Sequence, residues 1–263
     1  MTTQMHDPIT LAIDIGGTRL KAGLLDASGT FVAGPNRTDT PRPSGPAAVL
    51  AALTQIVASL GRFDRVSVGF PGVVRSGRVL TAPNLGTEAW HSYPLATDLA
   101  QRLGKPVRLL NDANVQGLGV IEGDGLECVL TLGTGIGFAL FQDGRLAPHL
   151  EMSQHPIRKD MTYDQYLGNA ALHAVGRPKW NKRLARALAI IETLTTYDIL
   201  LIGGGNAKVI DVDLRPNVRI VSNTAGITGG VRLWDQKLDV VFAHEEVPHR
   251  APPAWVTPAP VVP

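Results

Sequence analysis

The chain alternates short apolar runs with longer segments in which apolar residues recur every three or four positions. Short runs bounded by glycine, proline or aspartate are typical of strands, and the longer pattern is typical of amphipathic helices. Strands are expected at residues 10–15, 20–25, 65–70, 106–110, 128–132, 137–141, 198–203 and 218–222. Helices are expected within residues 45–61, 93–104 and 181–194. Strands that alternate with helices predict an α/β fold with a partly parallel sheet.

A weak internal repeat divides this pattern into two halves. Residues 13–29 (IDIGGTRLKAGLLDASG) and 130–144 (LTLGTGIGFALFQDG) share an apolar strand, a glycine-rich turn, a second apolar strand and a closing turn. We therefore predict a small N-terminal α/β domain over residues 1–112 and a larger C-terminal α/β domain over residues 113–235. The remainder, residues 236–263, is rich in proline and aperiodic, so we expect a loose tail there.

Composition narrows the classes of function. The chain has 263 residues, of which 44% are hydrophobic, and its 25 basic and 23 acidic residues leave a net charge of +2. Because these charges are spread along the chain, no overall field favours a nucleic-acid or membrane partner. The single cysteine, Cys128, excludes an internal disulfide and a thiolate zinc cluster. No leader or membrane-length apolar run is evident, so we expect a cytoplasmic protein.

Three glycine-rich turns are candidates for phosphate binding. Backbone amides in such turns can approach phosphate oxygens closely, and Thr18 adds a hydroxyl to the first turn. The first turn alone favours a plain hairpin, but its recurrence at residues 132–137 favours a phosphate clamp. The third turn, residues 203–206, follows an apolar strand and is either an anion site at a helix start or a tight connection.

Asn111 and Asp112 lie where an expected strand ends. Ligand crevices form at such strand ends in open α/β sheets, and a carboxylate there can deprotonate an alcohol that attacks phosphorus. The alternative is structural, since Asn and Asp are favoured helix N-caps.

Two loops and one helix carry weaker indications of ligand binding. Asn84 near Trp90 suits the hydroxyls and apolar face of a sugar, while the polar stretch at 151–160 is also consistent with a surface turn. The basic residues between 177 and 186 form either the solvated face of a helix or a path for a polyanion.

With these motifs in this order, the sequence resembles the ROK family of sugar kinases and repressors over roughly residues 10–235. Within that family it is most similar to the branch of polyphosphate-dependent glucokinases. The resemblance implies an actin-like ATPase and sugar kinase fold of two ribonuclease H-like halves, with an active site between them. It also implies Mg²⁺ and phosphoryl transfer from polyphosphate, ATP or both to a hexose hydroxyl, with glucose giving glucose 6-phosphate.

The resemblance also implies roles for individual residues. Asp112 would be the catalytic base, and the sugar would be bound by Asn84, Asn111, Asp112, Glu151 and His155. Asp14 would hold the metal ion. The phosphoryl donor would be bound by Asp14, Gly16, Gly17, Thr18, Lys21, Gly133, Thr134, Gly135, Gly137, Gly203, Gly204 and Gly205.

Two departures from the family pattern bear on function. Many members have glutamate, any residue, glycine and histidine in a row, whereas this chain has Glu151, Met152, Ser153 and Gln154, with His155 one place later. The zinc-binding cysteines of many members are missing, so no zinc is expected.

A sugar kinase is the first hypothesis, because of the paired glycine turns and Asp112. A non-catalytic sugar-binding regulator is the alternative, because of the altered stretch at residues 151–155. Because few residues precede the first strand, we expect no DNA-binding domain and hence no repressor. Relatives lead us to expect a homodimer.

Overall fold

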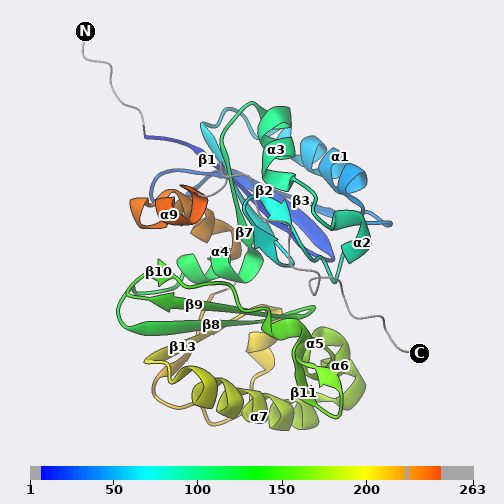
Figure 1. Ribbon diagram of the computed structural model, residues 1–263, viewed down its shortest axis with the longest axis vertical. Coiled ribbons are helices and arrows are strands. Elements are labelled where there is room, and N and C mark those ends of the chain that lie inside the picture. The colour runs from blue at the N-terminus through cyan, green and yellow to red at the C-terminus, as the bar shows by residue number, and fades with distance from the viewer. Residues whose placement is uncertain (1–6, 223–224, 244–263) are drawn as a thin grey trace.

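The computed structural model describes residues 7–222 and 225–243, which form two α/β lobes (Figure 1). Each lobe is built on a five-stranded sheet, in the orders β3-β2-β1-β4-β7 and β10-β9-β8-β13-β14. In both sheets three strands are antiparallel and the last two join in parallel. The two halves predicted from the glycine-turn repeat therefore share one topology.

The upper lobe in Figure 1 contains the first sheet and, from residues 46–103, three helices. Its elements are β1 (Thr10–Ile15), β2 (Arg19–Leu25), β3 (Phe31–Asp39), α1 (Pro46–Val57), β4 (Arg65–Phe70), β5 (Val74–Arg75), β6 (Arg78–Val79), α2 (Thr87–Trp90), α3 (Leu95–Leu103) and β7 (Val107–Asn111).

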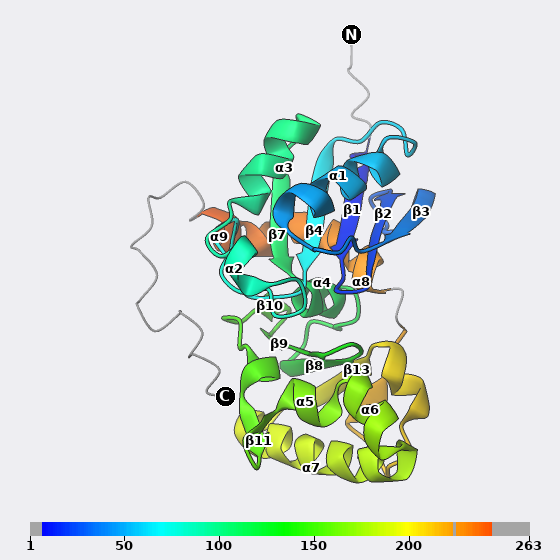
Figure 2. The same cartoon turned by 90° about the vertical axis from the view of Figure 1, so that its right-hand side faces the viewer.

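The lower lobe contains the second sheet and a layer of helices beneath it (Figures 1 and 2). Its elements are β8 (Leu126–Leu132), β9 (Ile136–Gln142), β10 (Arg145–Leu146), η1 (Met152–Gln154), β11 (Pro156–Arg158), β12 (Met161–Thr162), α5 (Tyr163–Leu167), α6 (Asn169–Val175), α7 (Arg177–Thr195), β13 (Ile199–Gly203), η2 (Gly205–Val209) and β14 (Val218–Ile220).

Strand β1 shows why its sequence forms a central strand. Side chains alternate between the two faces of a strand, so Leu11, Ile13 and Ile15 share one face and enter the core of the upper lobe. Ala12 points the opposite way and packs against Ile227 and Val231. Because both faces are covered, nearly every residue of β1 is buried. Asp14 shares the face of Ala12, and its side chain is 17% exposed.

Helix α4 (Asp112–Leu118) lies between the two sheets (Figures 1 and 2). Ala113, Val115 and Leu118 are buried with Val129 and Phe141 of the second sheet. Asn111 caps the helix, since its side-chain Oδ1 accepts a hydrogen bond from Ala113 N–H at 2.9 Å. The first residues of α4 are thereby fixed at the junction of the lobes.

After β14 the chain returns to the upper lobe. The returning elements are α8 (Ala225–Thr228), η3 (Gly229–Trp234), η4 (Gln236–Leu238) and α9 (Asp239–Phe242). Arg108 donates to Leu233 O and Asp239, and its guanidinium stacks 4.5 Å from the Trp234 ring centroid. We expected a loose tail from residue 236 onward. Residues 236–242 instead form η4 and α9, with Leu238 buried in the core, so the expectation is wrong for these residues. Residues 244–263 of that tail lie outside the described residues. The predicted boundary after residue 112 stays a prediction.

Ser67 joins the returning segment to β4. Its Oγ donates to Gly230 O at 2.6 Å and accepts from Trp234 Nε1 at 2.9 Å. We expect Ser67→Ala to lower the free energy of unfolding by about 1–3 kcal/mol, because it leaves two polar groups without their partner. Urea unfolding checks this, with the exposed Ser59→Ala as control; equal changes in both variants would contradict it.

Candidate active site

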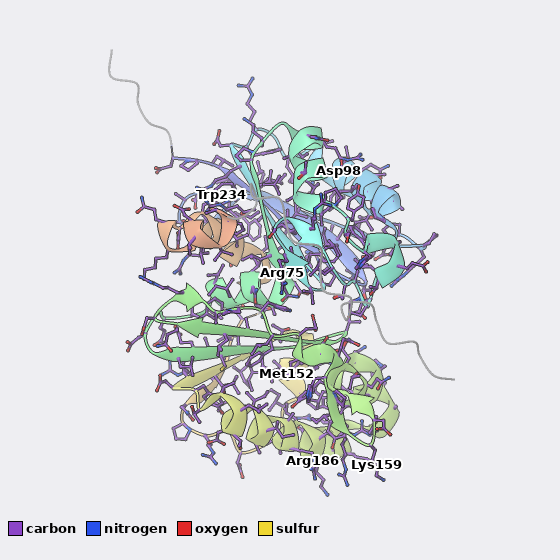
Figure 3. All side chains as sticks on the ribbon, viewed as in Figure 1. Arg75, Asp98, Met152, Lys159, Arg186 and Trp234 are labelled. Atoms are coloured by element: carbon purple, nitrogen blue, oxygen red, sulfur yellow. The ribbon has the colours of Figure 1, made fainter. Side chains whose placement is uncertain are left out.

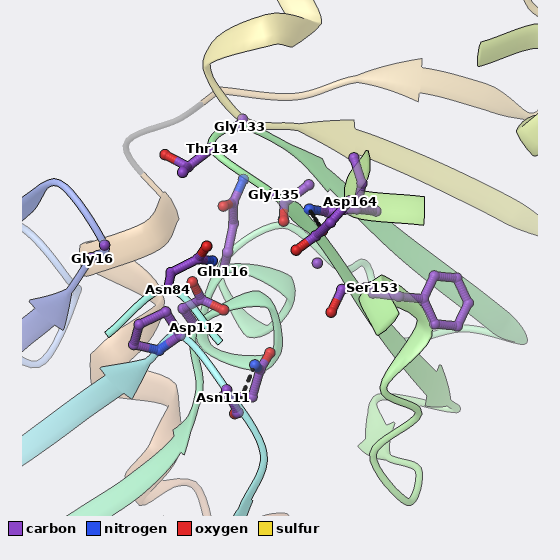
Figure 4. Close-up of a pocket in the computed structure, with 18 of the residues that line it drawn as sticks. Gly16, Asn84, Asn111, Asp112, Gln116, Gly133, Thr134, Gly135, Ser153 and Asp164 are labelled. Carbon is purple, nitrogen blue, oxygen red and sulfur yellow. Dashed lines mark hydrogen bonds between the residues drawn. The ribbon is translucent and has the colours of Figure 1, made fainter. Parts of the chain in front are cut away.

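A cleft of about 390 Å³ lies between the lobes and gathers most of the residues predicted to bind ligands. It is lined by Asp14, Gly16, Gly17, Lys21, Asn84, Asn111, Asp112, Gly133, Thr134, Gly135, Gly137, Glu151, Gly204 and Gly205. The turn after β1 and the turn after β8 face this cleft from opposite lobes, as Gly16 and Gly133 show in Figure 4. Their equivalent positions follow from the shared topology of the two sheets.

Three predicted residues do not line the cleft: Thr18, His155 and Gly203. Thr18 and His155 are exposed, and the His155 ring lies 6.3 Å from the Tyr163 ring between centroids. Gly203 is buried at the end of β13, directly behind the lining. The ligand roles of these three residues stay predictions.

Asp112 is the first residue of α4 and faces the cleft (Figure 4). Burial raises the pKa of Asp112 to about 7, and the nearby carboxylates of Asp14 and Glu151 add to this shift by repelling its charged form. A carboxyl group whose pKa lies near neutrality is suited to accept a proton from an alcohol. Asp112 therefore has the position and the proton affinity of a general base.

The side chain of Asn111 is already used within the protein. Its Nδ2 donates to Gly72 O at 3.1 Å, while its Oδ1 caps α4. These bonds hold the loop after β4 against the start of the helix that carries Asp112.

Asp14 and Lys21 form an ion pair in the cleft, with Nζ 2.8 Å from Oδ2. The two residues are paired across β1 and β2, so the hairpin itself brings them together. The pair puts one ammonium group beside the first glycine turn, where a phosphate chain would need positive charge.

Glu151 is held in the cleft by two neighbours. His149 Nε2 lies 3.3 Å from its Oε2, and the Ser153 hydroxyl donates to its Oε1. Burial alone would raise the pKa of Glu151, but these hydrogen bonds outweigh burial and lower it. The altered stretch at 151–154 therefore keeps an ionised carboxylate in the cleft.

Sequence reasoning missed five polar residues of the lining: Gln116, Thr131, His149, Ser153 and Asp164. Gln116 follows Asp112 by one helical turn, and that spacing was a usable signal. Asp164 lies in the first turn of α5, which Thr162 and Gln165 start with a reciprocal capping box. That signature predicts the helix but not its place beside the cleft. Burial raises the pKa of Asp164 to about 6 although Ile136 N–H donates to it at 2.6 Å.

The structure bears on two interpretations made from the sequence, that of Trp90 as a sugar contact and that of the basic helix. Trp90 is fully buried against Phe70 and Tyr93, so it does not offer its ring to a sugar. The basic cluster lies on α7, away from the cleft, as Arg186 shows in Figure 3. Arg183 stacks on the Tyr166 ring and donates to Tyr166 O at 3.0 Å. These contacts favour the solvated helix face over a polyanion path.

Within residues 7–222 and 225–243, no group of three or more histidine, cysteine, aspartate or glutamate side chains is arranged to hold a metal ion. Mg²⁺ is usually bound by one or two carboxylates together with substrate phosphates and water. Asp14 beside the glycine turn fits that donor set.

Among residues 7–222 and 225–243, no helix is long and apolar enough to span a membrane.

Comparisons with known proteins agree with this geometry. Residues 10–148 match the ROK family. A polyphosphate glucokinase of Mycobacterium tuberculosis (strain CDC 1551 / Oshkosh) is 32% identical over 87% of this chain and 91% of its own. The crystal structure of an inorganic polyphosphate/ATP-glucomannokinase from Arthrobacter sp. strain KM is 30% identical and superposes with a TM-score of 0.78, covering 86% of this chain and 98% of that one.

A ROK family glucokinase from Streptomyces griseus, solved with glucose and AMPPNP, is 20% identical and has a TM-score of 0.72 over 86% of this chain and 98% of that one. At this identity the likeness concerns the fold, which is that of the actin-like sugar kinases. The sequence match over most of the chain, together with the paired glycine turns, shows that the chain belongs to the ROK family.

Proposed function

We propose that this protein is a hexose kinase that transfers a phosphoryl group from polyphosphate or ATP to glucose. The observation that carries the proposal is the position of Asp112, a partly buried carboxyl group with a raised pKa between two glycine turns. The names of the M. tuberculosis and Arthrobacter relatives support the two donors and the sugar.

The residues of the cleft divide into two groups by chemistry. Asp112, Glu151 and Ser153 offer acceptors and hydroxyls suited to a sugar, and Asn84 adds a carboxamide from the upper lobe. The turns at residues 16–17, 133–135 and 204–205 offer backbone amides to phosphate oxygens. In this arrangement the sugar hydroxyl lies between its base and the donor.

The reaction is then a displacement at phosphorus. Asp112 accepts the proton of the attacking hydroxyl as the new oxygen–phosphorus bond forms, and the remaining phosphate chain leaves with the electrons of the broken bond. Lys21 and the loop amides stabilise the negative charge on the transferred group. We propose Mg²⁺ near Asp14, and this ion when bound neutralises charge on the donor.

The alternative of a non-catalytic sugar-binding protein is not favoured. Glu151 lines the cleft with a lowered pKa despite the changed residues that follow it, and Asp112 lines the cleft with a raised pKa. A homodimer, a cytoplasmic location and the absence of nucleic-acid or membrane partners stay predictions.

A product assay tests the function. Glucose, mannose, fructose and N-acetyl hexosamines are each incubated with ATP or polyphosphate, with Mg²⁺ or with EDTA. We expect glucose 6-phosphate with at least one donor and none in EDTA. Binding of hexose without any phosphorylated sugar, or release of phosphate without sugar phosphate, would overturn the proposal.

A further inference from the structure

Gln116 projects from α4 into the space between the sugar side and the phosphate side of the cleft. It lies one helical turn after Asp112, so both side chains emerge from the same face of α4. Figure 4 shows its carboxamide extended past Asp112 toward Gly133 and Thr134. Gln116 is therefore close both to the base and to the second glycine turn.

The Gln116 amide nitrogen is a buried donor without an acceptor. Among the residues that the structure describes, Nε2 has no hydrogen-bond partner although it is shielded from solvent. Leaving such a donor unpaired is costly, so buried amides are normally satisfied by protein or ligand. The torsion that orients a carboxamide has two broad minima, so Nε2 can turn from its shielded place to the open side of the cleft.

The surroundings of Nε2 indicate what the acceptor is. A Cβ atom on Gly203 would lie 2.1 Å from Nε2, so a larger residue there would push the amide aside. The neighbouring lining includes Gly133, Thr134 and Gly204, which belong to the turns that we propose bind phosphate. An uncharged donor at this place can bind a phosphate oxygen without drawing a proton from the base.

We propose that Nε2 of Gln116 donates a hydrogen bond to an oxygen of the phosphoryl group that is transferred. This inference rests on the proposed function and adds a donor-binding residue to it. Placed one turn from Asp112, this bond orients the phosphorus toward the hydroxyl that Asp112 deprotonates.

The first test removes the donor while keeping the shape. Gln116→Met preserves length without an N–H group, and Gln116→Glu replaces the donor with negative charge. We expect kcat/KM for the phosphoryl donor to fall about 10- to 100-fold in Gln116→Met and further in Gln116→Glu, since hydrogen bonds to charged groups are worth about 1.5–3 kcal/mol. Glucose affinity measured by calorimetry should stay within about twofold.

Gln142→Met is the matched control, because Gln142 is exposed at the end of β9. We expect it to keep the activity of the unmodified protein. Unchanged donor kinetics in the Gln116 variants, or a loss confined to glucose affinity, would overturn the inference.

The second test uses Gly203 to move the amide without changing Gln116. Gly203→Ala should displace Nε2 and weaken donor use, but it should add little in a protein that already carries Gln116→Ala. Equal losses from Gly203→Ala in both backgrounds would show that Gly203, not Gln116, carries the effect, and would overturn the inference.

A binding measurement separates this inference from the proposed function. Calorimetry with inorganic tripolyphosphate and Mg²⁺ requires no turnover. If the unmodified protein phosphorylates no sugar, weaker tripolyphosphate binding by Gln116→Met still supports the phosphate contact. Equal binding by both proteins refutes the contact whether or not the protein is a kinase.

Discussion

Replacing Asp112 by Asn should reduce kcat by about 10²–10⁴ while glucose still binds, because the carboxamide keeps the shape of the side chain but cannot accept the proton. Steady-state kinetics and calorimetry with glucose measure the two effects separately. Asp164→Asn is the matched control, since Asp164 is also a partly buried carboxyl group of the cleft with a raised pKa. An equal loss of kcat in both variants would contradict a specific role for Asp112.

The pH dependence of activity follows from the same group. The pKa of Asp112 is about 7, and only its ionised form is a base. We expect kcat/KM for glucose to rise with pH and to level off above about pH 7, with the rising limb absent from Asp112→Asn.

The contribution of Asp112 to the free energy of unfolding should fall as pH rises, whereas the activity should rise. A carboxyl group whose pKa is raised by folding, here from 3.8 to about 7, costs stability when it is ionised in the native state. That cost is complete above the folded pKa and absent below the unfolded one. Asp112→Asn should therefore be more stable than the unmodified protein at pH 8, on the order of a few kcal/mol, with a smaller difference at pH 5. Urea unfolding at both pH values checks this.

Gly204→Ala should weaken donor binding and destabilise the fold, because the backbone at Gly204 leaves no room for a side chain. Gly204 has a φ of +90°, and a Cβ atom there would lie 2.2 Å from Leu132 O and 2.5 Å from Leu132 N. Because both contacts are with the backbone of β8, relieving them requires the turn after β13, which lines the cleft, to shift. We expect a loss of about 2–4 kcal/mol in stability and at least a tenfold rise in the KM for the donor.

Gly205→Ala provides a matched comparison one residue later. Gly205 also lines the cleft, but a Cβ atom there meets nothing within 4 Å. We expect stability to change by less than about 0.5 kcal/mol. Thermal unfolding and donor kinetics of the two variants should differ clearly, and similar behaviour would show that the backbone of Gly204 is not constrained as described.

The two-lobed fold could be predicted because its signals are local and repeated. Strands β1 and β8 each end in a glycine turn and continue into a second apolar strand, and their equivalence predicted the shared topology. Strand β3 was missed because Gly34 and Pro35 interrupt its pattern, and none of its residues is buried at this edge of the sheet. Edge strands bury little, so hydrophobic periodicity hardly marks them.

The sequence predicted those residues of the cleft that belong to recognisable motifs, and it missed others. Asp14, Asp112 and the glycine turns stand at strand ends, where topology fixes their position. Asp164 and His149 reach the cleft through the packing of α5 and of the loop after β10, which no local pattern encodes. Similarly, His155 stood beside the right motif, yet η1 carries it to the surface, while His149 before the motif contacts Glu151.

The charge of the cleft determines the form in which a donor enters. Apart from His149, its ionisable side chains are four carboxyl groups, Asp14, Asp112, Glu151 and Asp164, and one ammonium group, Lys21. Above neutral pH the empty cleft therefore carries excess negative charge and repels a bare polyanion. The species that binds is then the phosphate chain together with its counter-cations. Moderate ionic strength, which weakens binding to basic channels by screening, should here reduce repulsion instead.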